Sequence, residues 1–242
     1  MRDLARHGAE LLAEADANGV SLLFEAAVAG GIPIIRPLLT SLAANRIERV
    51  EGIVNGTTNY ILSRMAAGGT DFAAALAEAQ RLGYAEAEPS ADVDGLDAAY
   101  KMCVLAAVGF GAQVHPDDVS PEGIRNITGR DFEAARQLGY TIKLLGIARR
   151  SGERLDLRVH PSLLPATHPL ASVDDVYNAV MVSGSSVGDV MFSGPGAGSM
   201  PTGSAVAGDV LELARHVAAG SHACRNGFAL RPTAVVPLGE TT

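Results

Sequence analysis

The segment from Gly83 to Lys101 constrains the fold of this chain most, because a cluster of carboxylates leads directly into a helix with almost no charge. The acidic side chains are those of Glu86, Glu88, Asp92, Asp94 and Asp97. The helix predicted at residues 96–110 carries only two charged residues, Asp97 and Lys101. A helix that is apolar nearly all round packs in the interior of a domain. We therefore expect the rest of the chain to surround this helix.

Asp97 and Lys101 are four residues apart, so their side chains share one face of the helix. One interpretation is an ordinary surface ion pair. The other is a general acid/base, because the 19 basic residues include only two lysines, Lys101 and Lys143. Lysine, unlike arginine, can release a proton near neutral pH when burial and a carboxylate adjust its pKa. Lys143 lies in an apolar segment with no carboxylate nearby in sequence, so rarity alone does not identify a function.

The same acidic segment also begins like a calcium-binding loop, with Asp92-x-Asp94. Leu96 stands where a third oxygen ligand is needed, and Asp97 stands where such a loop requires glycine. No glutamate closes the loop. The pattern therefore disfavours calcium, and Glu88, Asp92 and Asp94 are interpreted as loop solvation or support for the site.

Three motifs resemble those of a known family. Gly-Tyr-Ala-Glu-x-x-Pro (83–89) followed by Asp-x-x-Gly-x-Asp-x-x-x-Lys (92–101) closely resembles the catalytic segment of homoserine dehydrogenases. Residues 24–35, Phe-Glu-Ala-Ala-Val-Ala-Gly-Gly-Ile-Pro-Ile-Ile, are similar to the family's loop entering the catalytic domain. Residues 55–62, Asn-Gly-Thr-Thr-Asn-Tyr-Ile-Leu, are similar to its substrate-domain signature. The order of the three motifs makes the resemblance specific, and it extends to about Arg225.

The resemblance implies the NAD(P)-dependent interconversion of L-homoserine and L-aspartate 4-semialdehyde, a branch step toward threonine and methionine. It assigns the general acid/base role to Lys101 and the binding of the substrate to Glu86 and Asp97. It assigns contacts with NAD or NADP to Gly83, Gly196 and Gly198. It also implies a homodimer.

The resemblance further implies a sodium ion in the glycine-containing turn that otherwise indicates a flexible domain crossover. The family's ligands match Glu25, Val28, Gly30 and Ile32, and they act mostly through backbone carbonyls. A carboxylate with turned carbonyls suits a hard cation.

The start of the chain indicates an incomplete nucleotide-binding unit. A helix at 3–18 and a strand at 20–28 have no preceding βα unit against which to pack, and no GxGxxG follows a strand. The expected fold is α/β (α+β-like): a mixed sheet with helices on one face, plus terminal helices and a strand left from a Rossmann-type domain. The expected organisation is a nucleotide-domain remnant (1–28), a catalytic, substrate and dimerisation domain (29–200), a helix returning to the nucleotide domain (201–225) and a linker tail (226–242).

Periodicity and turn residues predict the remaining elements. Strands are expected at 46–55, 141–149, 155–162, 178–184 and 189–193. Helices are expected at 34–44, 59–66 (capped by Thr57 or Thr58), 72–82 (preceded by Asp71) and 131–138, with a short helix from Pro121. The glycine-rich run 194–198 precedes a helix that ends at Val217. Such a turn suits a phosphate, but as a lone motif this signal is weak, and a plain tight loop is the better interpretation.

The composition disfavours several classes of binding partner. The net charge is −8 and no basic stripe is present, which disfavours nucleic acid and anionic membranes. The two cysteines, Cys103 and Cys224, are far apart in the sequence, and no Cys/His set has the spacing of a metal site. No signal peptide and no apolar run long enough to span a bilayer is seen. A cytoplasmic location is therefore expected. Two alternatives remain: a non-catalytic amino-acid-binding or dimerisation fragment, and a semialdehyde-type reductase domain of another family.

Overall fold

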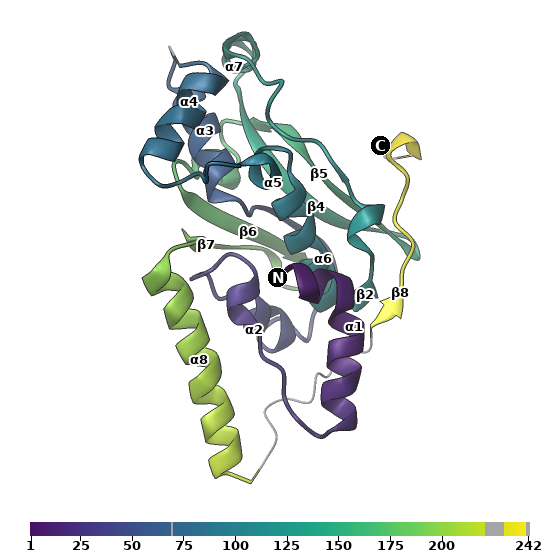
Figure 1. Cartoon of the computed structure of the whole chain (residues 1–242). Helices are drawn as coiled ribbons and strands as arrows, with labels where there is room; N and C mark the ends of the chain where they lie inside the picture. Colours follow the sequence, from purple (N-terminus) through teal and green to yellow (C-terminus); the bar gives the residue numbers. More distant parts are fainter. Residues whose placement is uncertain (69, 221–229, 241–242) are drawn as a thin grey trace.

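The computed structural model describes residues 1–68, 70–220 and 230–240, and it has a mixed sheet at its centre (Figure 1). The strands of this sheet are β1 (Ile47–Ile53), β3 (Ser120–Pro121), β4 (Tyr140–Ser151), β5 (Arg154–Pro165), β6 (Tyr177–Gly184) and β7 (Gly188–Pro195). Their order is β3-β5-β4-β1-β6-β7. Only β3 and β5 pair in parallel, and the other neighbours are antiparallel. The predicted α/β fold with a mixed sheet is confirmed.

The predicted apolar helix, α6 (Leu96–Phe110), lies across this sheet and forms the centre of the core. Met102 and Leu105 are fully buried. A methyl group on Gly146 of β4 would lie 2.4 Å from Cγ of Met102, so the strand and the helix approach each other at a position that only glycine permits. The helix α3 (Gly56–Ala66) packs on β4 and β6. The opposite face carries a smaller apolar cluster under the 3-10 helix η3 (Pro169–Ser172).

The other helices surround this core. They are α1 (Arg2–Ala17), α2 (Ile35–Leu39), α4 (Phe72–Arg81), α5 (Ser90–Val93), α7 (Gly129–Gln137) and α8 (Ser199–Ala218), with the 3-10 turns η1 (Glu25–Ala27), η2 (Pro116–Asp118) and η4 (Leu238–Glu240). Asp71 caps α4, since its Oδ1 accepts from the amide of Ala74 at 2.8 Å. The predicted cap of α3 is wrong, because Asn55 accepts the amide hydrogen of Thr58.

The strand predicted at residues 20–28 is wrong. Residues 20–24 form no regular element, and Glu25–Ala27 is the 3-10 turn η1. A strand is stable only where a neighbouring backbone offers its N–H and C=O groups, and no described strand pairs with this segment. The short helix predicted from Pro121 is also wrong, because that proline belongs to β3, which pairs with β5.

The C-terminal segment, predicted as part of a linker, follows the edge of the fold. Two short strands, β2 (Ala112–Gln113) and β8 (Arg231–Pro232), pair in parallel. The amide of Leu155 then donates to the carbonyl of Ala234 at 3.1 Å, and that of Val236 donates back to Leu155 at 2.8 Å. The parts of the expected segments 201–225 and 226–242 that fall at 221–229 and 241–242 lie outside the described residues.

The helix α8 runs along one side of the molecule, beside α2 (Figure 1). Arg36 of α2 holds it with ion pairs to Asp209 (3.1 Å) and Glu212 (2.7 Å). No residue of α8 is buried. Its exposed apolar side chains are Met200, Val206, Val210, Leu211 and Val217. An apolar surface of this kind is typical of a helix that contacts another domain or chain.

Candidate active site

Lys101 and Asp97 form a partly buried pair on α6. Nζ of Lys101 lies 2.7 Å from Oδ2 of Asp97, and the two side chains are only 16% and 18% exposed. The same Nζ donates to the carbonyl of Val54, immediately after β1, at 2.7 Å. This burial and the second bond distinguish the pair from an ordinary surface ion pair. An ammonium held by a carboxylate and a carbonyl has a fixed direction for proton transfer.

Asn55 connects this pair to the acidic loop. Its Nδ2 donates to Oδ1 of Asp92 and to Oδ2 of Asp97, both at 2.8 Å. Its Oδ1 accepts from the amide of Thr58 at 2.9 Å, which begins α3. One buried carboxamide therefore fixes the start of a helix and the orientation of two carboxylates. Asn55 was not among the site residues predicted from the sequence, although asparagine is a preferred N-cap residue.

Asp92 forms a hydrogen-bonded cluster with Asn55, Asp97 and Lys101 (the Lys101 cluster) and is not part of the solvated loop. Burial raises the pKa of Asp92, and the nearby charge of Asp97 adds to this effect, while the hydrogen bond from Asn55 and the charge of Lys101 oppose it. The other two loop acids are bound elsewhere. Arg125 donates to Asp94 at 3.1 Å, and the amide of Ser90 donates to Glu88 at 3.1 Å.

Glu86 is exposed, and no hydrogen bond between the described residues joins its carboxylate to Asp97 or Lys101. Its segment is nevertheless attached to the start of α3. The hydroxyl of Thr57 donates to the carbonyl of Tyr84 at 2.6 Å, and the ring of Tyr84 packs on Tyr60. Gly83 has φ +78° and open space around it. Both predicted residues therefore lie on an exposed loop beside α3.

The turn that contains Gly196 and Gly198 lies against the turn at residues 29–31. The amide of Gly31 donates to the carbonyl of Pro195 at 3.2 Å. A methyl group on Gly30 would lie 2.4 Å from the carbonyl oxygen of Gly196. Gly198 has φ +114° just before α8, a conformation that is essentially restricted to glycine. The structure thus brings together two turns to which the resemblance assigns different ligands.

Glu25 uses its carboxylate to cap α2. Oε1 accepts from the amides of Ile34 (2.6 Å) and Ile35 (2.8 Å), and Oε2 accepts from that of Arg36 (2.8 Å). An anion at a helix N-terminus is stabilised by these donors and by the helix dipole. The expected carboxylate ligand for sodium is therefore engaged, and a cation here would depend on backbone carbonyls. The described residues contain no group of three or more His, Cys, Asp or Glu that would hold a metal ion.

Ala29 and Gly30 give this turn its shape. Both have left-handed φ values, +56° and +50°. The amide of Ile32 donates to the carbonyl of Ala29 at 2.9 Å and closes the turn. Val28 and Ile32 are buried.

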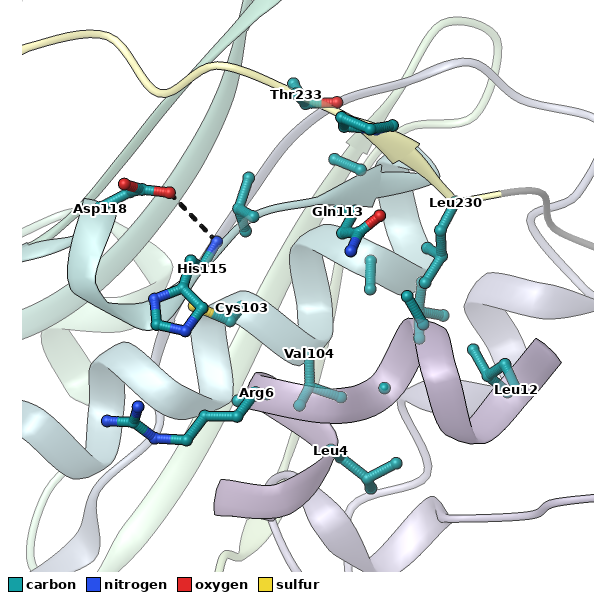
Figure 2. A pocket seen from close by; sticks show the side chains of 18 of the residues that line it. Leu4, Arg6, Leu12, Cys103, Val104, Gln113, His115, Asp118, Leu230 and Thr233 are labelled. Carbon is teal, nitrogen blue, oxygen red and sulfur yellow. Dashed lines mark hydrogen bonds between the residues drawn. The ribbon is translucent and has the colours of Figure 1, made fainter. Parts of the chain in front are cut away.

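A separate groove of about 440 Å³ lies between α1, α6 and the β2–β8 segment (Figure 2). Cys103 faces it, and burial raises the pKa of this thiol to about 12, so the cysteine is packing and not a nucleophile. None of the predicted site residues is among the described residues that line the groove. Cys224 lies outside the described residues.

Lys143, the second lysine, points to the sheet face opposite α6. Its Nζ donates to the carbonyl of Val173 at 2.6 Å and to Oδ1 of Asp174 at 2.8 Å. The side chain is 3% exposed. Lys143 thus has a carboxylate neighbour that is distant in sequence, and its role is to hold the loop before β6.

The family model described as Homoserine dehydrogenase matches residues 33–211. The chain belongs to the homoserine dehydrogenase family. A homoserine dehydrogenase of Synechocystis sp. is 56% identical over 214 residues, covering 87% of this chain and 49% of that protein. One of Corynebacterium glutamicum is 51% identical over 245 residues, covering 99% and 55%. The chain therefore spans about half the length of the curated relatives it matches.

Solved structures agree with this family. The crystal structure of a homoserine dehydrogenase from Thiobacillus denitrificans has a TM-score of 0.92 and 47% identity, covering 97% of this chain and 56% of that one. A hyperthermophilic archaeal homoserine dehydrogenase in complex with NADPH has a TM-score of 0.74 and 31% identity, covering 86% and 60%. No helix formed by the described residues has the length and hydropathy needed to cross a bilayer.

Proposed function

We propose that this chain supplies the substrate site of an NAD(P)-dependent homoserine dehydrogenase, which interconverts L-homoserine and L-aspartate 4-semialdehyde in the biosynthesis of threonine, methionine and isoleucine from aspartate. The observation that carries the proposal is the Lys101–Asp97–Asn55–Asp92 cluster in a chain of this family. The proposed location is the cytoplasm. A non-catalytic binding or dimerisation fragment has no need of a lysine held in this way.

In the proposed reaction, Lys101 acts as general acid/base. Its amine would take the proton of the substrate hydroxyl, and a bound nicotinamide would supply the acceptor for the hydride that leaves the carbon bearing that hydroxyl. In the reverse direction its ammonium returns that proton to the developing alkoxide. Its bonds to Asp97 and to the carbonyl of Val54 hold Nζ in place during both steps.

The substrate carries an ammonium group, which requires acceptors. Oδ2 of Asp97 already accepts from Asn55 and Lys101, so the other carboxylate oxygen is proposed to bind the substrate. Glu86 is proposed to approach from its exposed loop. Asp92 supports the site through Asn55.

The cofactor, NADP or NAD, is proposed to lie against Gly83, Gly196 and Gly198. The fit rests on the chemistry of these positions, because residues without side chains let a backbone approach a ligand closely. A relative's structure contains NADPH. Sodium is proposed to bind backbone carbonyls in the turn of Glu25, Val28, Gly30 and Ile32, with the Glu25 carboxylate supporting the turn by capping α2.

The proposed domain organisation follows from the two terminal helices. The exposed apolar side of α8, most of which lies in the expected returning segment, and the segment 1–28 would contact a nucleotide-binding domain, while residues 29–200 carry the substrate site. A homodimer is proposed through the sheet face opposite α6. On β5 this face holds buried polar atoms without partners among the described residues: Oδ1 of Asp156, Nε of Arg158 and Nε2 of His160.

The test uses a hybrid enzyme in which this chain replaces the segment that it matches in the Corynebacterium glutamicum relative. We expect the hybrid to reduce NADP or NAD with L-homoserine, measured by the absorbance of the reduced nicotinamide. Lys101→Arg keeps the charge and cannot exchange a proton, so kcat should fall about a hundredfold or more.

Lys143→Arg is the matched control, because it is the same substitution at the chain's other lysine. It should leave kcat within about threefold once the folded fraction is measured. Near-normal turnover by Lys101→Arg would show that a fixed positive charge is enough and that the acid/base role is wrong. If the hybrid binds NADPH but no variant, including the unsubstituted one, turns over L-homoserine, the proposed reaction is refuted.

A further inference from the structure

Asn178 is a buried polar residue that none of the predicted roles uses. It is the second residue of β6 and lies opposite Gly194 of β7. Its neighbour Ala179 belongs to the apolar cluster of the far sheet face, so the side chain of Asn178 points to the face that carries α3 and α6. The residue is 1% exposed, and its Oδ1 is buried without a hydrogen-bond partner among the described residues.

The carboxamide of Asn178 lies directly beneath Gly196. A methyl group on Gly196 would be 2.1 Å from Cγ and 2.2 Å from Nδ2 of this side chain. On its other side, a methyl group on Gly56 would be 3.5 Å from Oδ1. Gly56 directly follows Asn55, which holds Asp92 and Asp97. Asn178 therefore separates the glycine turn from the first residue of α3 by the thickness of one side chain.

The backbone around Asn178 is held firmly. Nδ2 of Asn59 donates to the carbonyl of Tyr177, one residue earlier, at 3.1 Å. The strand pairs with β1 on one side and with β7 on the other. The turn above it is also held from the opposite direction, because the carbonyl of Gly196 meets Gly30. A rigid spacer between two turns can set their separation, whereas a mobile side chain cannot.

An apolar residue of similar size would fill this space without leaving an unpaired acceptor, and an unpaired buried acceptor destabilises the folded state. The presence of asparagine therefore needs a reason other than packing. A buried polar atom left unpaired in a native structure calls for such an explanation, and a role at a functional site is one of those known.

We propose that Asn178 is a positioning residue whose carboxamide sets the height of the Gly196 turn above the start of α3, and thereby the position of the nicotinamide cofactor relative to the Lys101 cluster. This inference rests on the proposed function. It also explains why Gly196 must be glycine, since any side chain there meets Asn178.

The test is a double-substitution cycle in the hybrid enzyme, with NADPH affinity measured by fluorescence titration. Gly196→Ala should weaken NADPH binding at least about tenfold, because the new methyl group lifts the turn from Asn178. Adding Asn178→Ala removes the obstructing group and should restore the affinity to within about threefold, a coupling of the size found for residues in contact. The KM for L-homoserine should change less than the affinity for NADPH in every variant.

Gly129→Ala is the control, since a methyl group at this residue at the start of α7 meets nothing within 4 Å. It should not alter NADPH affinity. If Gly196→Ala does not fold alone but folds together with Asn178→Ala, the rescue demonstrates the same coupling. Additive losses in the two single variants, or normal NADPH affinity of Gly196→Ala, would overturn the inference. The NADPH titrations need no turnover and decide the inference by themselves, so an unsubstituted hybrid that binds NADPH and does not oxidise L-homoserine counts against the proposed function alone.

Discussion

Replacing Asn55 with alanine tests whether one carboxamide organises the site. The substitution removes the N-cap of α3, which is worth about 1 kcal/mol. It also removes two hydrogen bonds to carboxylates, each worth about 1.5–3 kcal/mol when fully buried. Asp97 is 18% exposed and retains Lys101 as a partner, so we count about half of that. Asn55→Ala should therefore lower the free energy of unfolding by about 2.5–4 kcal/mol, a large part of the ~5–15 kcal/mol typical of a domain.

Asn55→Asp separates the two contributions. The new carboxylate can still accept from the amide of Thr58, so the cap is kept. Its second oxygen would face the carboxylates of Asp92 and Asp97, from which the present Nδ2 is 2.8 Å away. Crowding of like charges raises carboxyl pKa values in the folded state. The stability of this variant is then fully present at low pH and is lost as the pH rises through those raised pKa values.

Urea unfolding of the chain and its two variants, followed by circular dichroism between about pH 4 and pH 8, measures both effects. The alanine variant should show a loss that shrinks only in part at acidic pH, because the hydrogen bonds to the ionised carboxylates depend on pH and the lost cap does not. The aspartate variant should approach the parent chain only at acidic pH. A loss below about 0.5 kcal/mol for Asn55→Ala, or a pH-independent loss for Asn55→Asp, would refute the reasoning.

Three further predictions concern single groups. Burial raises the pKa of Asp92, so its ionised form destabilises the folded state at neutral pH. Asp92→Asn should therefore raise the free energy of unfolding near pH 7, and the gain should vanish below about pH 4. A loss of stability at pH 7 in urea unfolding would contradict this. The thiol of Cys103, with its pKa raised to about 12, should stay unmodified by iodoacetamide at neutral pH in mass-spectrometric peptide mapping and react only in urea. Glu25→Gln should lower the free energy of unfolding by about 1–3 kcal/mol, because a side-chain NH₂ group would face the backbone amides from which the carboxylate now accepts hydrogen bonds. Glu133→Gln, at an exposed position, is the control and should leave thermal unfolding nearly unchanged.

Elements with local signals were predictable. The apolar helix 96–110 and the strand pairs β4–β5 and β6–β7 were found because their periodicity and turns lie within one segment. The strand expected at 20–28 depends on what lies beside that segment, and the structure has no strand there. The short strand β8 at residues 231–232 was not predicted for the same reason. Residues 231–236 form backbone hydrogen bonds with β2 and with Leu155. Residues 20–24 pair with none of the described strands.

The sequence by itself determined the family and the pairing of Asp97 with Lys101, because helical geometry makes residues four apart neighbours in any fold that keeps the helix. Only the tertiary structure revealed Asn55, which reaches Asp92 and Asp97 across 37 and 42 residues. Only the tertiary structure showed that Asn178 lies beneath Gly196 and that the carboxylate of Glu25 caps α2. The physical reason is that hydrogen bonds and close contacts are short-ranged in space, and folding decides which distant parts of the chain come within that range.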